Sequence, residues 1–357
     1  MPLIPAPIIG VSCEKIEQGF DSIKDALRAI KSARAIPAIR VVLELEKDPA
    51  DYFDIVRELH GTTPDTRLAY VMAEIADSFF LWKFNKEHEG HPEHMDLKKR
   101  LKSYLDKLGE FVDVWEIGNE VNGEWAGWRE DPATGFKDWE KEGMNQMRHS
   151  VASSTLDMYR MVTTHPKGES ASTALTLYFY MKRYPDCLPN TLDTKDGKKF
   201  TVNGNDYDFE TWLNDTALLK PEKNFSPDYV LLSVYEDECR DDDCRDQQVS
   251  VSDWVEIFKV VQGHFKNAQV GFGETGSHCA RCDGTLIPRH QEDCIKMQKA
   301  NINQHYGDVH LGIIKKIEEG ERLNYIGGYF NWYFHDDMVQ PGSKPLKALT
   351  DSIRRWP

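Results

Sequence analysis

The sequence lacks the features that mark several large classes of protein. No apolar run reaches the roughly 18 residues needed to cross a bilayer, so we expect no membrane insertion. Acidic residues outnumber basic ones, 59 to 44, and the net charge of −15 argues against nucleic acid as a partner. Short repeats and low-complexity linkers are also missing. With 40% hydrophobic and 29% charged residues, the composition is that of a globular protein.

Several sequence signatures of ligand sites are missing as well. The first expected strand leads into Gly10–Cys13 without a G-x-G-x-x-G turn, which disfavours a doubly wound nucleotide-binding sheet. No histidine pair lies on that strand to hold a catalytic metal, and no expected strand ends in the lysine that a Schiff-base aldolase needs. The acidic run Glu236–Cys244 lacks the spacing of a calcium loop, so a solvated loop is the preferred interpretation.

Seven cysteines are present, and three of them (Cys279, Cys282 and Cys294) lie close together near His278 and His290. This cluster fits either a zinc site or disulfide bonds. The second half of a zinc motif is absent, so disulfides are the stronger hypothesis, although the sequence leaves their connectivity open. The cysteines favour a secreted or periplasmic location. The first residues have neither a basic region nor a long apolar core, and we expect them to begin the fold rather than form a signal peptide.

Short apolar runs rich in β-branched and aromatic residues recur along the chain, and amphipathic helical patterns lie between them. Continuous apolar strands of this kind are typical of a parallel sheet covered on both faces. The expected strands are Ala6–Val11, Ala38–Leu45, Leu68–Ala73, Val112–Ile117, Ala174–Tyr180, Tyr229–Val234, Gln269–Phe272 and Tyr325–Trp332. The expected helices are Phe20–Ala33, Leu97–Phe111, Met147–Val162, Trp254–Phe265 and Pro345–Arg355.

Eight strands alternating with helices over 357 residues predict a single (β/α)8 TIM barrel. We expect one domain spanning residues 1–357. The longest connection, about 181–228, is predicted to be an elaborated loop between strands five and six. It contains hairpin-type turn signals and a helical pattern near Phe209–Leu219.

Two glutamates stand where the expected strands end, which is where barrel enzymes carry their active sites. Glu120 follows Asn119 at the end of strand four, and Glu274 lies among glycines at the end of strand seven. These strands face each other across the barrel mouth. Two carboxyl groups so placed can cleave a glycosidic bond, one giving a proton to the leaving oxygen and the other attacking the anomeric carbon.

The segment Trp115-Glu116-Ile117-Gly118-Asn119-Glu120, followed in order by Gly271-Phe272-Gly273-Glu274, resembles the clan A retaining glycoside hydrolases. The resemblance implies the (β/α)8 barrel, Glu120 as acid/base and Glu274 as nucleophile, with no metal or organic cofactor. It also implies roles in substrate binding or nucleophile orientation. These fall to Arg40 on strand two, Asn119 beside the 2-hydroxyl, Tyr235 after strand six, and Trp332 as the sugar platform.

Further residues are candidates for contacts with sugar. Glu74 and Asp77 follow strand three and either bind hydroxyls or cap the next helix, while Trp125 lies in a loop where tryptophans stack on sugar faces. Glu116 is expected to support the barrel. The sequence therefore predicts a retaining β-glycoside hydrolase acting on an oligo- or polysaccharide. The alternative is a carbohydrate-binding barrel with little or no activity; the oligomeric state is not predicted.

Overall fold

The computed structural model is a closed barrel of eight parallel strands, each paired with its neighbours in chain order. It describes residues 4–84, 89–122, 144–179, 225–235, 249–279 and 286–357. The strands are β1 (Ile8–Cys13), β2 (Ala38–Val42), β3 (Tyr70–Glu74), β4 (Val114–Gly118), β5 (Ser172–Tyr178), β6 (Tyr229–Val234), β7 (Gln269–Thr275) and β8 (Tyr325–Asn331). The predicted TIM barrel is confirmed.

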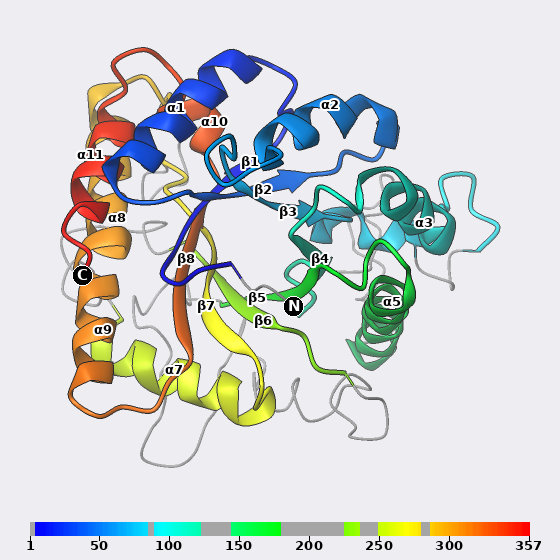
Figure 1. The fold of residues 1–357 in the computed structure, drawn as a ribbon. Helices are drawn as coiled ribbons and strands as arrows, with labels where there is room; N and C mark the ends of the chain where they lie inside the picture. The colour runs from blue at the N-terminus through cyan, green and yellow to red at the C-terminus, as the bar shows by residue number, and fades with distance from the viewer. Residues whose placement is uncertain (1–3, 85–88, 123–143, 180–224, 236–248, 280–285) are drawn as a thin grey trace.

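Helices surround the strands on the outside of the barrel (Figure 1). They are α1 (Phe20–Ala33), α2 (Pro49–His60), α3 (Leu97–Leu108), α5 (Met144–Thr164), α7 (Val251–His264), α8 (Glu292–Ile302), α9 (His310–Glu318), α10 (Phe334–Met338) and α11 (Lys344–Ile353). A 3-10 segment, η1 (Ser78–Phe84), follows β3, and a π-helical segment, η5 (Asn303–Val309), joins α8 to α9. None of the described helices is long and apolar enough to cross a membrane.

Local sequence signals explain several of these elements. Helix α1 has the predicted bounds, and α7 begins after Ser250, whose hydroxyl accepts a hydrogen bond from the Asp253 backbone N–H at 3.2 Å. Helix α2 was not expected from the apolar pattern, although Asp48 caps its first turn and Pro49 occupies its first position. Helices α8 and α9 were not expected either.

The interior of the barrel is divided into an apolar layer and a charged layer. The apolar layer includes Ala38, Met72, Val114 and Ala174, which lie at or before the middle of their strands. Successive strand residues point to opposite faces, so the residue two positions further on returns to the interior. On β2 that residue is Arg40. The charged layer therefore lies toward the carboxyl ends of the strands.

A larger apolar cluster fills the space between the outer face of the strands and the helices. Leu27 of α1, Leu105 of α3 and Phe258 of α7 are wholly buried in it. This outer core holds the strands rigidly, which positions the side chains at their carboxyl ends.

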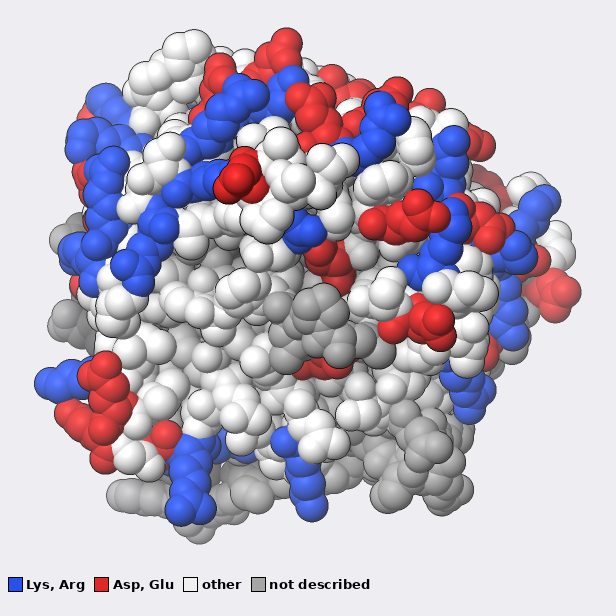
Figure 2. All heavy atoms as spheres, viewed as in Figure 1, with Lys and Arg blue, Asp and Glu red and all other residues white. Residues whose placement is uncertain are grey.

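Part of the expected organisation lies outside the described residues. The elaborated loop of about 181–228, with its predicted helix near Phe209–Leu219, falls mostly there. The single-domain organisation of residues 1–357 stays a prediction. In Figure 2, acidic and basic side chains both lie around the rim of the face shown.

Candidate active site

Arg40, in the middle of β2, joins three carboxyl groups from three other strands. It donates from Nε to Glu116 Oε2 and from Nη1 to Glu274 Oε1, both at 2.6 Å. Its Nη2 lies 3.0 Å from Glu74 Oε2. Arg40 is 1% exposed, and the three glutamates are also buried. One guanidinium therefore faces three carboxyl groups in a region that water does not screen.

This excess of acid over base changes the protonation of the cluster. Burial alone would lower the pKa of Arg40, but the three nearby carboxylates raise it. The combined effect of the carboxylates is larger, so the pKa lies well above its ordinary value. Burial raises the pKa of Glu74 well above its ordinary 4.5 despite the nearby guanidinium. Burial also raises the pKa of Glu116, which keeps stronger hydrogen bonds from Arg40 and from the Thr176 hydroxyl. Since Glu74 has the longest contact with Arg40, it is the member most readily kept neutral.

Glu274, near the end of β7, is held at both of its carboxylate oxygens. Arg40 donates to Oε1, and the Tyr235 hydroxyl donates to Oε2 at 2.6 Å. Its backbone N–H donates to the Ser233 hydroxyl oxygen at 3.3 Å. These contacts join β2, β6 and β7, and they place Arg40 and Tyr235 against Glu274. They fix the direction in which the carboxylate points.

Glu120 lies just beyond β4 in a different environment. Its φ of 43° is in the left-handed region, which is uncommon for a residue with a side chain and often found at functional sites. It is 7% exposed, and burial raises its pKa well above the ordinary value; the charges of Glu274 and Asp77 raise the pKa further. A hydrogen bond with Ser233 and the charge of Arg40 oppose this only in part. Glu120 is therefore suited to carry a proton at neutral pH.

Two buried polar atoms, one on this carboxyl group and one on the residue before it, lack hydrogen-bond partners within the described part of the chain. They are Glu120 Oε1 and Asn119 Oδ1. Asn119 is 1% exposed. Buried polar atoms in folded proteins are nearly always paired, so unsatisfied ones at a strand end are consistent with a ligand site.

Trp332 follows β8 and lies over the charged layer. Its ring centroid is 5.5 Å from Arg40 Cζ, and its backbone N–H donates to the Thr275 carbonyl at 2.9 Å. The side chain is half-buried. The structure therefore brings Trp332 together with Arg40 and the end of β7. Trp125 lies outside the described residues.

Three residues near the pair were not predicted from the sequence. Ser233 contacts both Glu120 and the backbone of Glu274. His278, three positions beyond β7, packs its ring on Tyr235 with 4.4 Å between ring centroids, and Tyr333 packs edge-on against His278 at 5.8 Å. His278 was noted only as a neighbour of the cysteines, because the connection that brings it to Tyr235 is a loop without a strand or helix pattern.

The cysteine cluster contains a disulfide. Cys279 and Cys294 are bonded to each other, while Cys282 lies outside the described residues. Cys13 on β1 is a buried free cysteine. Among the residues that the structure describes, no group of three or more histidine, cysteine or acidic side chains is arranged to hold a metal ion. The disulfide hypothesis is thus confirmed for one pair.

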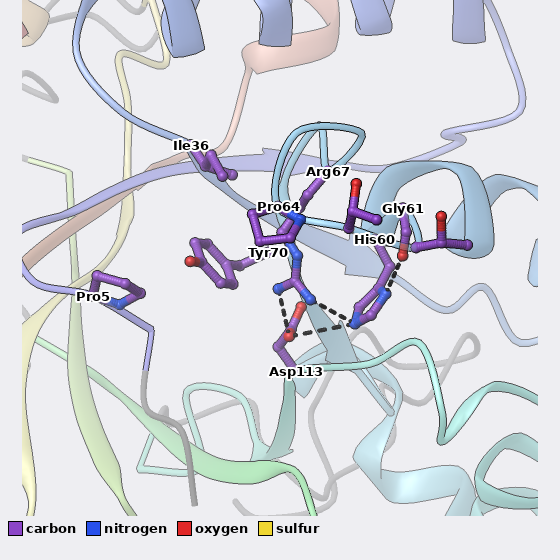
Figure 3. A pocket seen from close by; sticks show the side chains of 10 residues that line it. Pro5, Ile36, His60, Gly61, Pro64, Arg67, Tyr70 and Asp113 are labelled. Carbon is purple, nitrogen blue, oxygen red and sulfur yellow. Dashed lines mark hydrogen bonds and ion pairs between the residues drawn. The ribbon is translucent and has the colours of Figure 1, made fainter.

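A hollow of about 340 Å³ lies at the opposite end of the barrel, where β3 and β4 begin (Figure 3). Arg67 donates there to Asp113 Oδ1 at 2.8 Å, and its Nη2 lies 2.8 Å from His60 Nε2. The other oxygen of Asp113 accepts from the Val71 backbone N–H at 2.8 Å. In this network the single positive charge of Arg67 is matched by the single carboxylate of Asp113, and the polar groups hydrogen-bond to one another. It joins the starts of the two strands and contains no pair of carboxyl groups.

No family model matches the chain, and no curated protein matches it. Solved structures do match. A glycoside hydrolase family 5 enzyme from Prevotella bryantii, in complex with a xyloglucan tetradecasaccharide, has a TM-score of 0.52 and 12% identity over 99% of each chain. A β-glucosidase from Exiguobacterium marinum has a TM-score of 0.54 and 11% identity over 93% of this chain and 90% of its own.

A further match is an endo-β-mannanase/endo-β-glucanase from Prevotella bryantii, with a TM-score of 0.51 and 13% identity over 97% of this chain. This chain spans only 48% of that protein. At such identities the similarity shows the fold. The resemblance to the clan A barrels is therefore confirmed at the level of architecture, by structures of glycoside hydrolase families 5 and 1.

Proposed function

We propose that this chain is a retaining β-glycoside hydrolase in which Glu274 is the nucleophile and Glu120 is the general acid and base. The observation that carries the proposal is the contrast between the two carboxyl groups. Glu274 is held at both oxygens by Arg40 and Tyr235, whereas burial and the charge of Glu274 raise the pKa of Glu120. Two carboxyl groups in opposite protonation states are what double displacement requires.

In the first step Glu120 gives its proton to the glycosidic oxygen as the bond from that oxygen to the anomeric carbon breaks. Glu274 attacks the anomeric carbon from the other face and forms a glycosyl ester. In the second step Glu120, now a carboxylate, takes a proton from water as the water attacks the anomeric carbon and frees Glu274. This mechanism expects the two carboxyl groups to be about 5–5.5 Å apart.

The electrostatics of the pair support this exchange of roles. The negative charge of Glu274 is one of the causes that raise the pKa of Glu120. Formation of the ester removes that charge, so the pKa of Glu120 falls in the intermediate. The same side chain is then held as a carboxylate, which is the form that can accept a proton from water.

The remaining candidate residues have roles in binding and orientation. Arg40 and Tyr235 fix the nucleophile, and Trp332 provides an aromatic surface beneath the cleaved sugar. The unpaired Oδ1 of Asn119 accepts a hydrogen bond from the 2-hydroxyl. Glu74 acts from beneath the site, through its contact with Arg40. Trp125 is assigned from the sequence alone to stacking on the substrate.

The substrate class is a β-linked oligo- or polysaccharide. The family 5 structure in complex with a xyloglucan oligosaccharide supports a carbohydrate substrate for this barrel. The disulfide between Cys279 and Cys294 supports a secreted or periplasmic location, since such bonds persist in oxidising compartments.

The proposal is tested by hydrolysis of a panel of β-linked polysaccharides and oligosaccharides, with the anomer of the first product followed by proton NMR. We expect the β-anomer to form first, and we expect Glu274→Gln and Glu120→Gln to remove nearly all activity while they keep the fold. An α-anomer formed first would contradict retention. Binding without hydrolysis across the whole panel would support the carbohydrate-binding alternative instead.

A further inference from the structure

We propose that His278 is a positioning residue that holds Tyr235 in the orientation needed to donate its hydrogen bond to Glu274. The inference rests on the proposed function and extends it to a residue outside the strand ends. Tyr235 follows β6, whereas His278 comes from the connection after β7. Their rings are 4.4 Å apart between centroids and inclined by 40°, which is close packing for two aromatic rings.

Tyr235 needs such support because its bond to Glu274 depends on the direction of its hydroxyl. The Oη–Oε2 distance is 2.6 Å, and hydrogen bonds weaken steeply as the angle departs from linear. The ring is also packed near Gly276, where an added Cβ would lie 3.7 Å from Tyr235 Cε1. His278 and the Gly276 backbone therefore restrict how the Tyr235 ring can turn.

His278 is itself held in place by further side chains. Tyr333 packs edge-on against its ring, and the Arg289 guanidinium lies 3.5 Å from the centroid of Tyr333. Arg289 donates to both oxygens of Asp337, at 2.6 and 2.5 Å, and to the Ser277 carbonyl at 3.1 Å. A two-pronged contact of this kind fixes the guanidinium plane and, through it, the ring of Tyr333.

The disulfide fixes the backbone on the other side of His278. Cys279 is its immediate neighbour and is bonded to Cys294 in the first turn of α8. Both cysteines are completely buried. The Gln298 amide donates to Asp337 Oδ1 at 2.8 Å and to Cys294 Sγ at 3.1 Å, so the disulfide and the Arg289–Asp337 pair form one connected support. His278 is thus carried by a fixed segment rather than by a free loop.

A double-mutant cycle of His278→Ala and Tyr235→Phe tests whether His278 acts through Tyr235. The removal of the tyrosine hydroxyl should lower kcat/KM by about 10- to 100-fold, as for the loss of a hydrogen bond to a charged group. His278→Ala should lower it by about 10-fold in the wild-type background and by less than about 2-fold when Tyr235 is already phenylalanine. His290→Ala is the matched control, because His290 is an exposed histidine of the same connection, and it should leave kcat/KM unchanged.

His278→Phe separates packing from other roles of the imidazole. A phenyl ring can fill the same place against Tyr235, so this variant should keep kcat/KM within about 3-fold of the wild type. The double substitution of Cys279 and Cys294 by alanine should reduce kcat/KM as His278→Ala does, and the two effects should not add. Equal losses from His278→Ala in both Tyr235 backgrounds would overturn the proposal, as would no loss in either.

A crystal structure of His278→Ala provides a test that does not depend on turnover. We expect the distance from Tyr235 Oη to Glu274 Oε2 to exceed hydrogen-bonding range in the variant. An unchanged contact would overturn the positioning role even if activity fell. If the wild-type protein cleaves no glycoside, the proposed function fails, while this distance still decides whether His278 positions Tyr235.

Discussion

Two arginines connect strands at opposite ends of this barrel, and they differ in how their charge is matched. Arg67, at the end where the strands begin, is 17% exposed at its side chain and pairs with one carboxylate, Asp113. Arg40, toward the end where the strands finish, is 1% exposed and faces Glu74, Glu116 and Glu274. A matched pair near water joins two strands and contributes modestly to stability. An unmatched buried cluster perturbs protonation and so is suited to chemistry.

The largest difference between the two ends of the barrel should appear when a carboxyl group is replaced at each. Glu120→Ala removes the proton donor, so we expect kcat/KM to fall by about 10²- to 10⁴-fold for substrates with poor leaving groups. For a dinitrophenyl glycoside, whose leaving group needs no proton, formation of the glycosyl–enzyme should be much less affected. Stopped-flow release of the phenol measures this step.

Asp113→Asn is the matched control at the other end of the barrel, and its kcat/KM should equal that of the wild type. A large loss in Asp113→Asn, or an equal loss on both substrates in Glu120→Ala, would contradict the division between the networks.

The pH dependence of the reaction should follow from Glu120 in the same way. Its pKa is raised well above the ordinary value, so Glu120 keeps its proton to a higher pH than an ordinary carboxyl group and loses it as the pH rises through the raised pKa. The alkaline limb of kcat/KM should therefore come from Glu120. Glu120→Gln should lack that limb in its residual activity, as measured with the dinitrophenyl glycoside between about pH 5 and 9. An unchanged alkaline limb would assign it to another group.

Replacing each arginine in turn shows how much its network contributes to the stability of the protein. Arg40→Met leaves buried carboxyl groups without their cation, so the free energy of unfolding should fall by about 3–5 kcal/mol. Arg67→Met breaks a partly exposed pair and should lower it by about 1 kcal/mol or less. Urea denaturation followed by tryptophan fluorescence gives both values.

If Arg40→Met does not fold, Arg40→Lys is the alternative, because lysine keeps the charge but lacks the planar guanidinium group. Arg40→Lys should still lower the free energy of unfolding by more than Arg67→Lys does. Similar losses of unfolding free energy at the two sites would contradict the difference between the two arginine networks.

The smallest effect concerns Glu74. Burial raises its pKa in the folded protein, so the folded protein keeps a proton that the unfolded chain releases above its ordinary pKa of 4.5. The folded state binds more protons in that range, and stability therefore falls as the pH rises until the raised pKa is passed. Glu74→Gln lacks this component, so its stability relative to wild type should increase with pH, by at most about 1.4 kcal/mol per pH unit. A stability difference that is flat from pH 5 to 8 would show that Glu74 is ionised.

Much of this arrangement could be predicted from the sequence because it follows from periodicity and strand ends. The bounds of β6 and α1 match their predictions, which came from the apolar pattern. Arg40, Tyr235 and Trp332 were assigned by the resemblance to the clan A barrels, and the structure places them near Glu274. Glu116, expected to support the barrel, accepts a hydrogen bond from Arg40 inside the barrel. The interior positions of Arg40 and Glu116 depend only on which face of a strand a side chain occupies.

The remaining features depend on contacts that no local pattern encodes. The contact between His278 and Tyr235 requires the path of the segment that ends at the Cys279–Cys294 disulfide, and the sequence left that pairing open. The positive φ of Glu120 and its hydrogen bond with Ser233 of β6, more than 100 positions along the chain, also have no local sequence signal. Trp125 and the loop of about 181–228 stay predictions.

The central claim is that Glu274 is the nucleophile, and covalent labelling tests it most directly. The intact protein is incubated with 2-deoxy-2-fluoro β-glycosides that carry good leaving groups, and its mass is then measured and the labelled peptide sequenced. We predict a mass gain of one fluorosugar on Glu274, with none in Glu274→Gln and with normal labelling in Asp113→Asn. A label on any other residue would contradict the account.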